Sequence, residues 1–343
     1  MKKKIVVFGI DNFSKKNIGQ LDCLLKNYYE LDIFTNDVFK NSILNTQNKA
    51  KVYILEKSFL SRFKQVYNYL KLNSKQINHA EIYPGGRFAF VYIFLCRVFK
   101  IKTIAVERGD LLYYSRYDKL TQFSMRMVYK NSNIVWYREL YMKNILESKF
   151  TKNIIFLHNS VNIKKLQVKE YKYNFLWVNR FIKERKVKWF VDSVNELKFS
   201  KSIMLGLMNL YDEEKYALSN QSEYLEVFDY QDPKDYYLNS KFFVLPSDVV
   251  FLNNALLEAM SYGVVPLISD VQDARLIVDD GINGFIFEHT ENGLKNAMKK
   301  AMLLSQEEYE IMSKNAIKKV EKSFSYDVWC EKYINMIKSL NNV

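Results

Sequence analysis

Short apolar runs alternate with amphipathic stretches along the 343 residues of the chain. An apolar run rich in β-branched and aromatic residues is typical of a buried strand, and apolar residues at helical spacing are typical of a helix packed on one face. Their alternation predicts βαβ units on a parallel sheet. In the first half we expect strands at Lys4–Phe8, Leu31–Thr35, Lys51–Leu55, Ala80–Tyr83, Thr103–Val106, Ile134–Tyr137 and Ile154–Leu157, and helices at Phe59–Leu72, Phe88–Phe99 and Lys119–Tyr129.

The alternation starts again after Lys164–Tyr173, a polar stretch that suits a linker. The last stretch, Tyr326–Leu340, has apolar residues at helical spacing. We expect two doubly wound α/β domains facing a cleft, residues 1–165 and 166–325, and a C-terminal helix over residues 326–343 that packs across their junction. The strands expected in the second half are Phe175–Val178, Ser202–Leu205, Leu225–Phe228, Phe242–Leu245, Val264–Ile268 and Gly284–Phe287.

The composition favours two hydrophobic cores. Hydrophobic residues make up 48% of the sequence, and only 10 Gly and 4 Pro argue against disorder or long linkers. The N-terminal lysines precede a short apolar run that meets Asp11, which suits a first strand better than a signal peptide. The nearest candidate for a spanning helix, Phe88–Cys96, is far shorter than the roughly 20 residues required, so we expect a soluble or peripheral protein.

Positive charge is concentrated in the first half. Residues 1–170 hold 30 Lys and Arg against 13 Asp and Glu, whereas the remainder holds 21 against 25. A one-sided basic domain predicts an anionic partner, such as a membrane leaflet, phosphate groups or nucleic acid. No nucleic-acid-binding motif accompanies the charge, so we expect no nucleic-acid partner.

Cysteine and histidine usage gives no support for a metal site. The spacing of Cys23, Cys96 and Cys330 is neither a zinc pattern nor CxxC, and the three histidines are well separated. We therefore expect reduced cysteines in a cytoplasmic protein.

A single carboxylate, Glu258, lies in an otherwise uncharged helical run that ends at Gly263 and leads into Val264–Ile268. A helix that enters a strand through one glycine is typical of a parallel α/β sheet, whose ligands bind at the loops beside such joints. An ionised carboxylate only accepts hydrogen bonds, which suits it to the two hydroxyls of a ribose. By itself the residue is interpreted equally well as a solvated helix glutamate.

Cations gather after another expected strand. Arg180 follows Phe175–Val178, and Arg185 and Lys186 lie in the next loop or first helical turn. Cations are disfavoured at a helix N-terminus by roughly 0.3–1 kcal/mol, so their presence there suggests that an anion joins them. Arg offers a planar fork of donors and Lys a point charge, a suitable pair for a diphosphate. The alternative is a solvated basic turn.

Several motifs stand in order over about residues 155–290. HNSVN at His158–Asn162 is followed by the strand–Arg–Arg–Lys segment, LPS at Leu245–Ser247, LLEAMSYGVVP from Leu256 and DGINGF from Asp280. Together they resemble the C-terminal domain of family-4 (group 1) retaining glycosyltransferases, which have the GT-B fold of two Rossmann-like domains.

The resemblance implies roles for these residues. Arg180, with Arg185 or Lys186, would hold the diphosphate of a nucleotide sugar, and Glu258 would hold the ribose. Backbone amides before the Glu258 helix would meet the donor sugar or phosphate, as free N–H groups at a helix start attract phosphate oxygens. The donor-binding residues implied there are Phe251, Leu252, Asn253 and Asn254.

One position departs from the family pattern. The family has two glutamates in this motif, and the first one is replaced by Val250. The replacement leaves three alternatives. The donor sugar lacks the hydroxyls that such a glutamate would contact, as in a deoxy or amino sugar; a neighbour such as Asp248 takes its place; or activity is lost.

The first half resembles the family less. The segment ERGDLLYYSRY at Glu107–Tyr117 is similar to one that faces the donor sugar in relatives, which makes Arg108 and Asp110 candidate catalytic residues. The alternative is a surface turn with a structural Arg–Asp pair. The loop Pro84–Arg87 follows another expected strand and is a candidate border of the acceptor site.

We therefore expect a retaining hexosyltransferase that moves a sugar from a nucleotide-diphosphate sugar to a hydroxyl of a lipid-linked saccharide, in the synthesis of a bacterial lipopolysaccharide or capsule. No DxD pair is present, and we expect neither metal nor cofactor, with arginines stabilising the leaving diphosphate. The charge suggests a cytoplasmic protein that is peripheral on the inner face of the membrane. The alternatives are a sugar-binding or scaffold protein without turnover, a nucleic-acid-binding protein and a sugar-nucleotide epimerase.

Overall fold

The chain forms two compact units. The first comprises Met1–His158 with Cys330–Val343, and the second comprises Asn159–Trp329. The division lies after His158 rather than after residue 165, and the chain returns to the first unit at Cys330. The computed structural model describes residues 4–10, 15–36, 50–163, 171–199, 201–206, 212–250 and 253–340.

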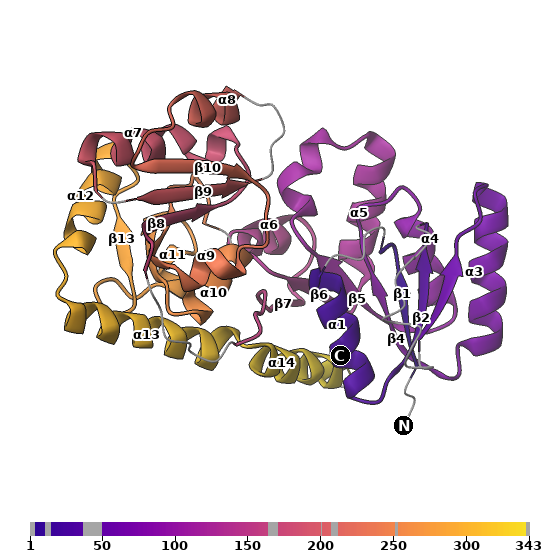
Figure 1. Ribbon diagram of the computed structural model, residues 1–343. Helices are drawn as coiled ribbons and strands as arrows, with labels where there is room; N and C mark the ends of the chain where they lie inside the picture. Colours follow the sequence, from indigo (N-terminus) through magenta and orange to yellow (C-terminus); the bar gives the residue numbers. More distant parts are fainter. Residues whose placement is uncertain are drawn as a thin grey trace. The chain divides into compact units, whose positions relative to one another are not determined.

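The first unit contains a seven-stranded sheet in its described part, in the order β3-β2-β1-β4-β5-β6-β7 (Figure 1). Every pairing in it is parallel. Its strands are β1 (Lys4–Phe8), β2 (Glu30–Thr35), β3 (Ala50–Ile54), β4 (Ile77–Ile82), β5 (Lys102–Glu107), β6 (Ile134–Tyr137) and β7 (Ile154–Phe156). Its helices are α1 (Lys15–Lys26), α3 (Phe59–Asn73), α4 (Ala89–Val98), η1 (Asp110–Arg116), α5 (Lys119–Asn131) and α6 (Met142–Lys149).

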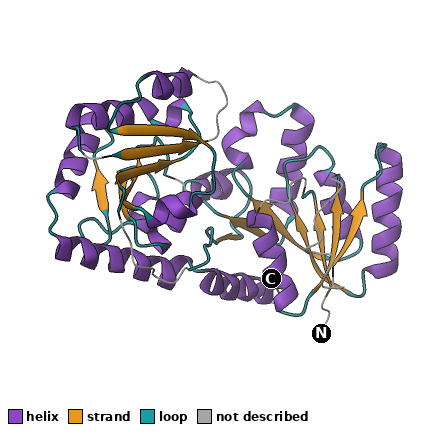
Figure 2. Ribbon diagram, viewed as in Figure 1, coloured by secondary structure: helices purple, strands orange, loops and turns teal. Residues whose placement is uncertain are grey.

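The second unit repeats this arrangement with a six-stranded parallel sheet in the order β10-β9-β8-β11-β12-β13. Figure 2 shows each sheet flanked by helices. The strands are β8 (Tyr173–Val178), β9 (Ser202–Gly206), β10 (Leu225–Asp229), β11 (Ser240–Leu245), β12 (Val265–Ser269) and β13 (Phe285–Phe287). The helices are η2 (Lys183–Arg185), α7 (Val187–Leu197), α8 (Asp212–Ser219), α9 (Lys234–Leu238), α10 (Asn254–Ser261), α11 (Ala274–Ile277), α12 (Glu291–Met302), α13 (Gln306–Phe324) and α14 (Tyr326–Ser339), which continues into the first unit.

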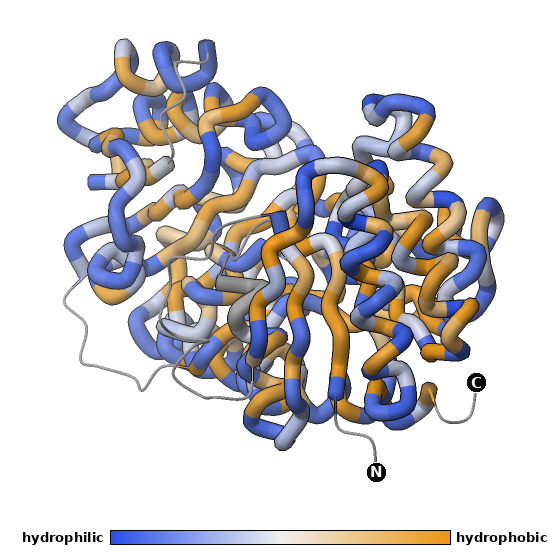
Figure 3. Tube along the Cα trace, turned by 90° about the vertical axis from the view of Figure 1, so that its right-hand side faces the viewer, coloured by the Kyte–Doolittle hydropathy of each residue, from blue (hydrophilic) through white to orange (hydrophobic). Residues whose placement is uncertain are grey.

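All the strands expected from the sequence are present, with ends shifted by a residue or a few. The side chains of the inner strands are buried on both faces because helices cover both sides of a parallel sheet, and these strands are therefore continuous apolar runs. The edge strands β3 and β7 are only partly buried. The strands accordingly appear mostly orange in the hydropathy view (Figure 3). The expected linker Lys164–Tyr173 lies largely outside the described residues, and Tyr173 belongs to β8.

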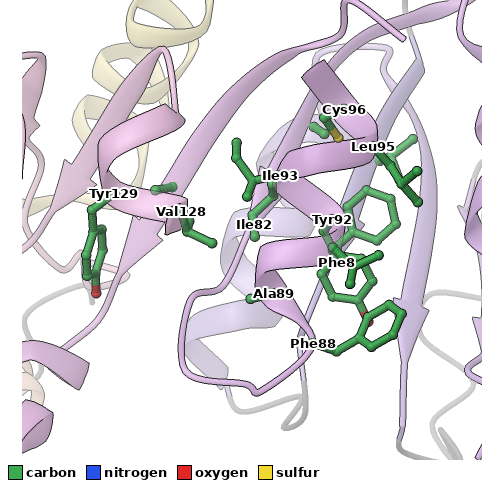
Figure 4. Packing of buried hydrophobic residues seen from close by; sticks show 14 of the residues in the cluster. Phe8, Ile82, Phe88, Ala89, Tyr92, Ile93, Leu95, Cys96, Val128 and Tyr129 are labelled. Atoms are coloured by element: carbon green, nitrogen blue, oxygen red, sulfur yellow. The ribbon is translucent and has the colours of Figure 1, made fainter. Parts of the chain in front are cut away.

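Aromatic rings fill the core of the first unit. Phe8 of β1 stacks on Tyr92 of α4 with ring centroids 4.5 Å apart, and Phe88 meets the same Tyr92 ring edge-on at 5.1 Å (Figure 4). Phe8 and Tyr92 are almost completely buried. Contacts of this size each bury a large apolar area and fix α4 on the sheet.

The joint at Gly263 is confirmed. Gly263 has a left-handed φ of 72°, and a Cβ added to it would lie 2.6 Å from Ser313 Oγ. Glycine alone meets both conditions without strain. The chain leaves α10 through this residue and enters β12 directly.

The expectation of three reduced cysteines is wrong. Cys23 of α1 and Cys330 of α14 form a disulfide with Cα atoms 5.8 Å apart, and Cys96 is free and buried. The two partners are separated by 307 positions in the sequence, and the fold brings them together. The cysteines therefore give no support for a reducing compartment.

Reducing this disulfide should destabilise the first unit by about 2–4 kcal/mol, because the crosslink restricts the unfolded chain. Urea unfolding with and without dithiothreitol measures the loss. The double variant Cys23→Ala/Cys330→Ala serves as the control. Its stability should equal that of the reduced protein and should not change when dithiothreitol is added. Titration of the denatured, unreduced protein should find one thiol, that of Cys96. Three thiols in that titration would contradict the pairing.

Candidate functional site

The strand order of the second sheet reverses between β8 and β11. β9 and β10 extend the sheet on one side, and β12 and β13 extend it on the other. The loops that leave β8 and β11 therefore diverge at the carboxyl edge, where open α/β sheets bind ligands. The first loop carries Arg180, Arg185 and Lys186, and the second carries Ser247 and Asp248.

Arg185 ties these two loops together. It is buried, and its Nη1 donates to Ser247 Oγ at 2.7 Å and to the Val249 carbonyl at 2.9 Å. The backbone joins the same loops, since the Asp248 N–H donates to the Glu184 carbonyl at 2.9 Å. Nη1 of Arg185 is thus committed to holding the loop after β11 in place.

Lys186 begins α7 from a left-handed conformation with φ 47° and reaches the same loop. Its Nζ lies 2.8 Å from Asp248 Oδ1, and His289 Nε2 lies 2.8 Å from the same oxygen. The Trp189 ring packs against the side chains of both residues, with its centroid 5.0 Å from that of the His289 imidazole and 5.4 Å from Lys186 Nζ. Asp248, the candidate substitute for the missing glutamate, is therefore held by two protein partners.

The hydrogen-bond network assigns the proton of His289. The Asp248 carboxylate only accepts, so the hydrogen lies on His289 Nε2. His289 Nδ1 lies 3.0 Å from Ser269 Oγ, which accepts from the Ser247 N–H at 3.1 Å. Burial favours a raised pKa for Asp248, but the hydrogen bonds from Lys186 and His289 outweigh it and hold that pKa below its ordinary value.

Arg180 stands apart from this network. Its side chain is exposed, and it has neither an ion pair nor a side-chain hydrogen bond with any residue that the structure describes. A permanently charged guanidinium at the carboxyl edge, without a partner among the described residues, is available to an anionic ligand.

Glu258 lies on the second turn of α10, half-buried, and is held by a buried tyrosine. Tyr237 of α9 donates its hydroxyl to Glu258 Oε2 at 3.3 Å, and the Tyr262 ring stacks on the Tyr237 ring at 5.6 Å. Burial, followed by the charge of Glu258, raises the pKa of Tyr237 well above its ordinary value, so the phenol stays protonated as a donor. This hydrogen bond orients the carboxylate through one of its two oxygens.

The remaining donor-site candidates differ in what can be said of them. Asn253 caps α10, its Oδ1 accepting from the Leu256 N–H at 3.2 Å. Asn254 is the first residue of that helix, and its Oδ1 is buried without a hydrogen-bond partner among the described residues. Phe251 and Leu252 lie outside the described residues.

Val250, at the position of the first family glutamate, is completely buried. It is an apolar side chain of the domain core, and it presents no polar group to a ligand. The substitution therefore changes the chemistry of this loop as well as its sequence.

In the first unit, Arg108 is enclosed by protein groups. Its guanidinium lies over the rings of Tyr83 at 5.0 Å and Trp136 at 5.6 Å, and it donates to Gln20 Oε1. Asp110 begins η1, and its side chain lies outside the described residues.

A buried polar network continues from Gln20. Its Nε2 donates to Glu81 Oε2 at 2.5 Å, and Tyr333 of α14 donates to the other oxygen of the same carboxylate. His79 Nε2 lies 3.6 Å from Glu81 Oε1, and both side chains are fully buried. Arg108 is therefore attached to the interior of the first unit through Gln20.

Sequence reasoning missed Tyr237, His289, Gln20 and Glu81. His289 was open to detection, because it follows closely on the strand ending at Phe287 and so lies at the carboxyl edge. Tyr237 and Gln20 gave no such signal, since each acts through a partner on a different element, 21 positions away for Tyr237 and 61 for Gln20.

Residues 172–303 match the model of the family described as glycosyl transferases group 1. The second unit carries a group 1 glycosyltransferase domain. A protein of Methanocaldococcus jannaschii named as an uncharacterized glycosyltransferase is 25% identical over 193 residues, which are 54% of this chain and 54% of that protein. The chain thus spans about half the length of the curated relative that it matches.

Solved structures extend the likeness to both units. A glycosyltransferase from Rickettsia africae has a TM-score of 0.79 at 12% identity, covering 99% of this chain and 98% of its own. Alr3699/HepE from Anabaena, solved with UDP, has a TM-score of 0.80 at 10% identity, covering 98% and 100%. Identities this low establish the fold alone, and that fold is GT-B, with the group 1 glycosyltransferase domain as its second half.

In the described ranges, no group of three or more His, Cys, Asp and Glu side chains is arranged to hold a metal ion. No helix in those ranges is long and apolar enough to cross a membrane.

Replacing Asp248 by Asn should lower the free energy of unfolding at pH 7 by about 1 kcal/mol or less, because the ion pairs are partly exposed. A depressed pKa means that the carboxylate stabilises the fold above its unfolded pKa of about 3.9 and loses this effect as the pH falls through the lower folded value. The free energies of unfolding of wild type and variant should therefore become equal in acid, where a protonated Asp resembles Asn.

Urea unfolding near neutral pH and again well below the ordinary carboxyl pKa tests this prediction. Glu321→Gln is the matched control, because it removes one exposed carboxylate from α13 that has no described partner. An equal loss of stability in the control, or a loss in Asp248→Asn that persists in acid, would rule out the ion pairs as the cause.

Proposed function

We propose that this chain is a retaining glycosyltransferase that moves a hexosyl group from a nucleoside-diphosphate sugar to a hydroxyl of a lipid-linked saccharide. The observation that carries the proposal is Arg180, an exposed guanidinium without a described protein partner at the β8–β11 switch point of a group 1 domain. The leaving diphosphate is a weak base, so catalysis depends mainly on stabilising its developing charge. Arg180 supplies that charge, and Lys186 lies on the same loop to add a second cation.

Glu258 is proposed to bind the ribose. Tyr237 donates to one of its oxygens, which orients the carboxylate and leaves it acceptor capacity for the two vicinal hydroxyls. Arg185 supports the site by holding the loop after β11 in place. Metal independence is part of the proposal, since the cations on the β8 loop offer the charge that a metal ion would otherwise supply.

The donor and acceptor classes draw on the structural neighbours. Alr3699/HepE from Anabaena was solved with UDP, with UDP and glucose, and with UDP-glucose. Another neighbour, at a TM-score of 0.72 and 16% identity, is the lipopolysaccharide outer core galactosyltransferase WaaB. These names support a uridine-diphosphate hexose as the first donor to test and a cell-surface polysaccharide, such as lipopolysaccharide or capsule, as the product.

The membrane part of the proposal rests on charge. The excess of Lys and Arg over residues 1–170 favours an anionic surface, where each such residue contributes roughly 1 kcal/mol. We propose that the enzyme acts as a peripheral protein on the inner face of the cytoplasmic membrane.

Thermal-shift measurements with UDP, GDP, ADP, CMP and dTDP test the donor site. One nucleotide should stabilise the wild type, by roughly 2.7 kcal/mol at a concentration 100 times its Kd. Arg180→Ala should weaken that nucleotide on the order of tenfold or more, since it removes a charge-assisted hydrogen bond. Arg126→Ala, an exposed arginine of α5 in the first unit, is the control and should bind as the wild type does.

The ribose assignment has its own comparison. Glu258→Gln should weaken the preferred nucleotide but not its 2′,3′-dideoxy analogue, because that analogue lacks the hydroxyls the carboxylate accepts from. Equal weakening of both would show that Glu258 acts elsewhere. Absence of a shift with every nucleotide, in folded protein, would contradict the donor site as a whole.

A second candidate function is a sugar-binding or scaffold protein that keeps the GT-B fold without turnover. The buried Val250 favours it, because the group 1 motif then lacks its first carboxylate. We expect instead that the wild type hydrolyses or transfers the donor sugar in the presence of EDTA, and that Glu258→Ala is slower by on the order of a hundredfold. Product analysis by chromatography, with anomeric configuration read by NMR, measures both. Nucleotide binding without any turnover would establish the scaffold.

A further inference from the structure

The first sheet has a switch point of its own, and a pocket opens there. Its strand order reverses between β1 and β4, and Gly9 and Tyr83, which follow these strands, both line the pocket. The volume is about 430 Å³, within the size range of small-molecule sites. The lining residues are Gly9, Asn36, Lys57, Phe59, Arg62, Tyr83, Gly86, Arg87, Phe88, Ala89, Tyr92 and Leu120.

The charged residues of the described lining are all cations. Lys57, Arg62 and Arg87 contribute three positive charges, and none of the other described lining residues is acidic. Such a pocket focuses a positive potential on whatever enters it. The ligand expected here is therefore an anion, and the forked guanidinium groups suit phosphate oxygens.

Arg62 is held in place before any ligand arrives. Its Nε donates to the Glu56 carbonyl at 2.9 Å, its Nη2 donates to Asn36 Oδ1 at 2.8 Å, and its Cζ lies 5.3 Å from the centroid of the Phe88 ring. Arg87 is exposed and meets only one carboxylate, that of Asp118 at 3.3 Å among the described residues. An exposed pair of this kind contributes little, so Arg87 can turn to an incoming phosphate at small cost.

The rim of the pocket is apolar and exposed. Phe59 is 57% exposed and Leu120 is 47% exposed, although both are large hydrophobic side chains. The aromatic surface continues beyond the lining, because Phe59 packs on Phe90 at 6.3 Å and Phe90 packs on Phe123 at 5.7 Å. Phe123 is 47% exposed and Leu60, beside Phe59, is 62% exposed. A contiguous exposed apolar surface next to a cationic pocket fits an amphiphilic ligand.

We propose that this pocket binds the phosphate or diphosphate group of the lipid-linked acceptor, and that the apolar rim contacts the beginning of its hydrocarbon chain. The inference rests on the proposed glycosyl transfer and adds to it the group that the enzyme recognises on the acceptor. Lys57, Arg62 and Arg87 hold the phosphate oxygens, and Phe59 and Leu120 take the first carbons of the lipid.

Isothermal titration with two soluble probes, geranyl diphosphate and inorganic pyrophosphate, separates a lipid phosphate from a free one. The wild type should bind geranyl diphosphate at least several times more tightly than pyrophosphate. Lys57→Gln/Arg87→Gln should weaken both probes about tenfold or more, which corresponds to about 1.4 kcal/mol. Phe59→Ser should weaken geranyl diphosphate alone.

Two controls locate the binding. Lys71→Gln/Lys130→Gln removes the same charge from exposed positions at the far ends of α3 and α5 and should bind as the wild type does. Arg180→Ala should leave geranyl diphosphate binding unchanged while weakening the nucleotide. This contrast distinguishes failure of the pocket assignment from failure of the donor site.

Three results would overturn the inference. Equal affinity for the two probes would show that the site takes a free anion. Loss of geranyl diphosphate binding in Arg180→Ala but not in Lys57→Gln/Arg87→Gln would move the anion to the second unit and leave the proposed function standing. Equal losses of affinity in Lys57→Gln/Arg87→Gln and in Lys71→Gln/Lys130→Gln would show that the effect comes from net charge alone.

Discussion

A parallel sheet carries the carboxyl ends of all its strands to one edge, and reversal of the strand order opens that edge at one point. Both units of this chain obey the same constraint, with reversal between β1 and β4 in the first and between β8 and β11 in the second. Residues that are far apart in the sequence, such as Arg180 and Asp248, reach one region because each follows one of the two central strands. The position of a candidate residue is thus decided by which strand it follows.

The loops at the two points where the strand order reverses differ in how their charged residues are paired. In the second unit the loops are crosslinked, since Arg185 holds Ser247 and Asp248 accepts from Lys186 and His289. Lys186 and Asp248 are paired with each other there, whereas the side chain of Arg180 has no partner that the structure describes. In the first unit the described lining of the pocket carries cations and no acid. A network of paired charges makes the loops of a site rigid, whereas a cluster of cations without acids attracts anions.

The fold was predictable because the inner strands of each sheet are buried on both faces and are therefore continuous apolar runs in the sequence. The same reasoning found Gly263 and the positions of Arg180 and Glu258, which depend on local order along the chain. It failed for contacts that only tertiary packing creates. Tyr237 reaches Glu258 from another helix, and Val250 is completely buried although it lies in a loop.

The longest of these contacts concern the last helix. Tyr333 of α14 donates to Glu81, which also accepts from Gln20, and Gln20 accepts in turn from Arg108. Burial, and then the charge of Glu81, raises the pKa of Tyr333 well above its ordinary value, so the tyrosine remains a donor. Removing one member would leave a buried carboxylate short of a donor, which costs more than the bond itself contributes. The disulfide joins α14 to α1, the helix that carries Gln20, and so fixes both donors of Glu81 at once. The surroundings of Arg108 are therefore set by residues from both ends of the chain.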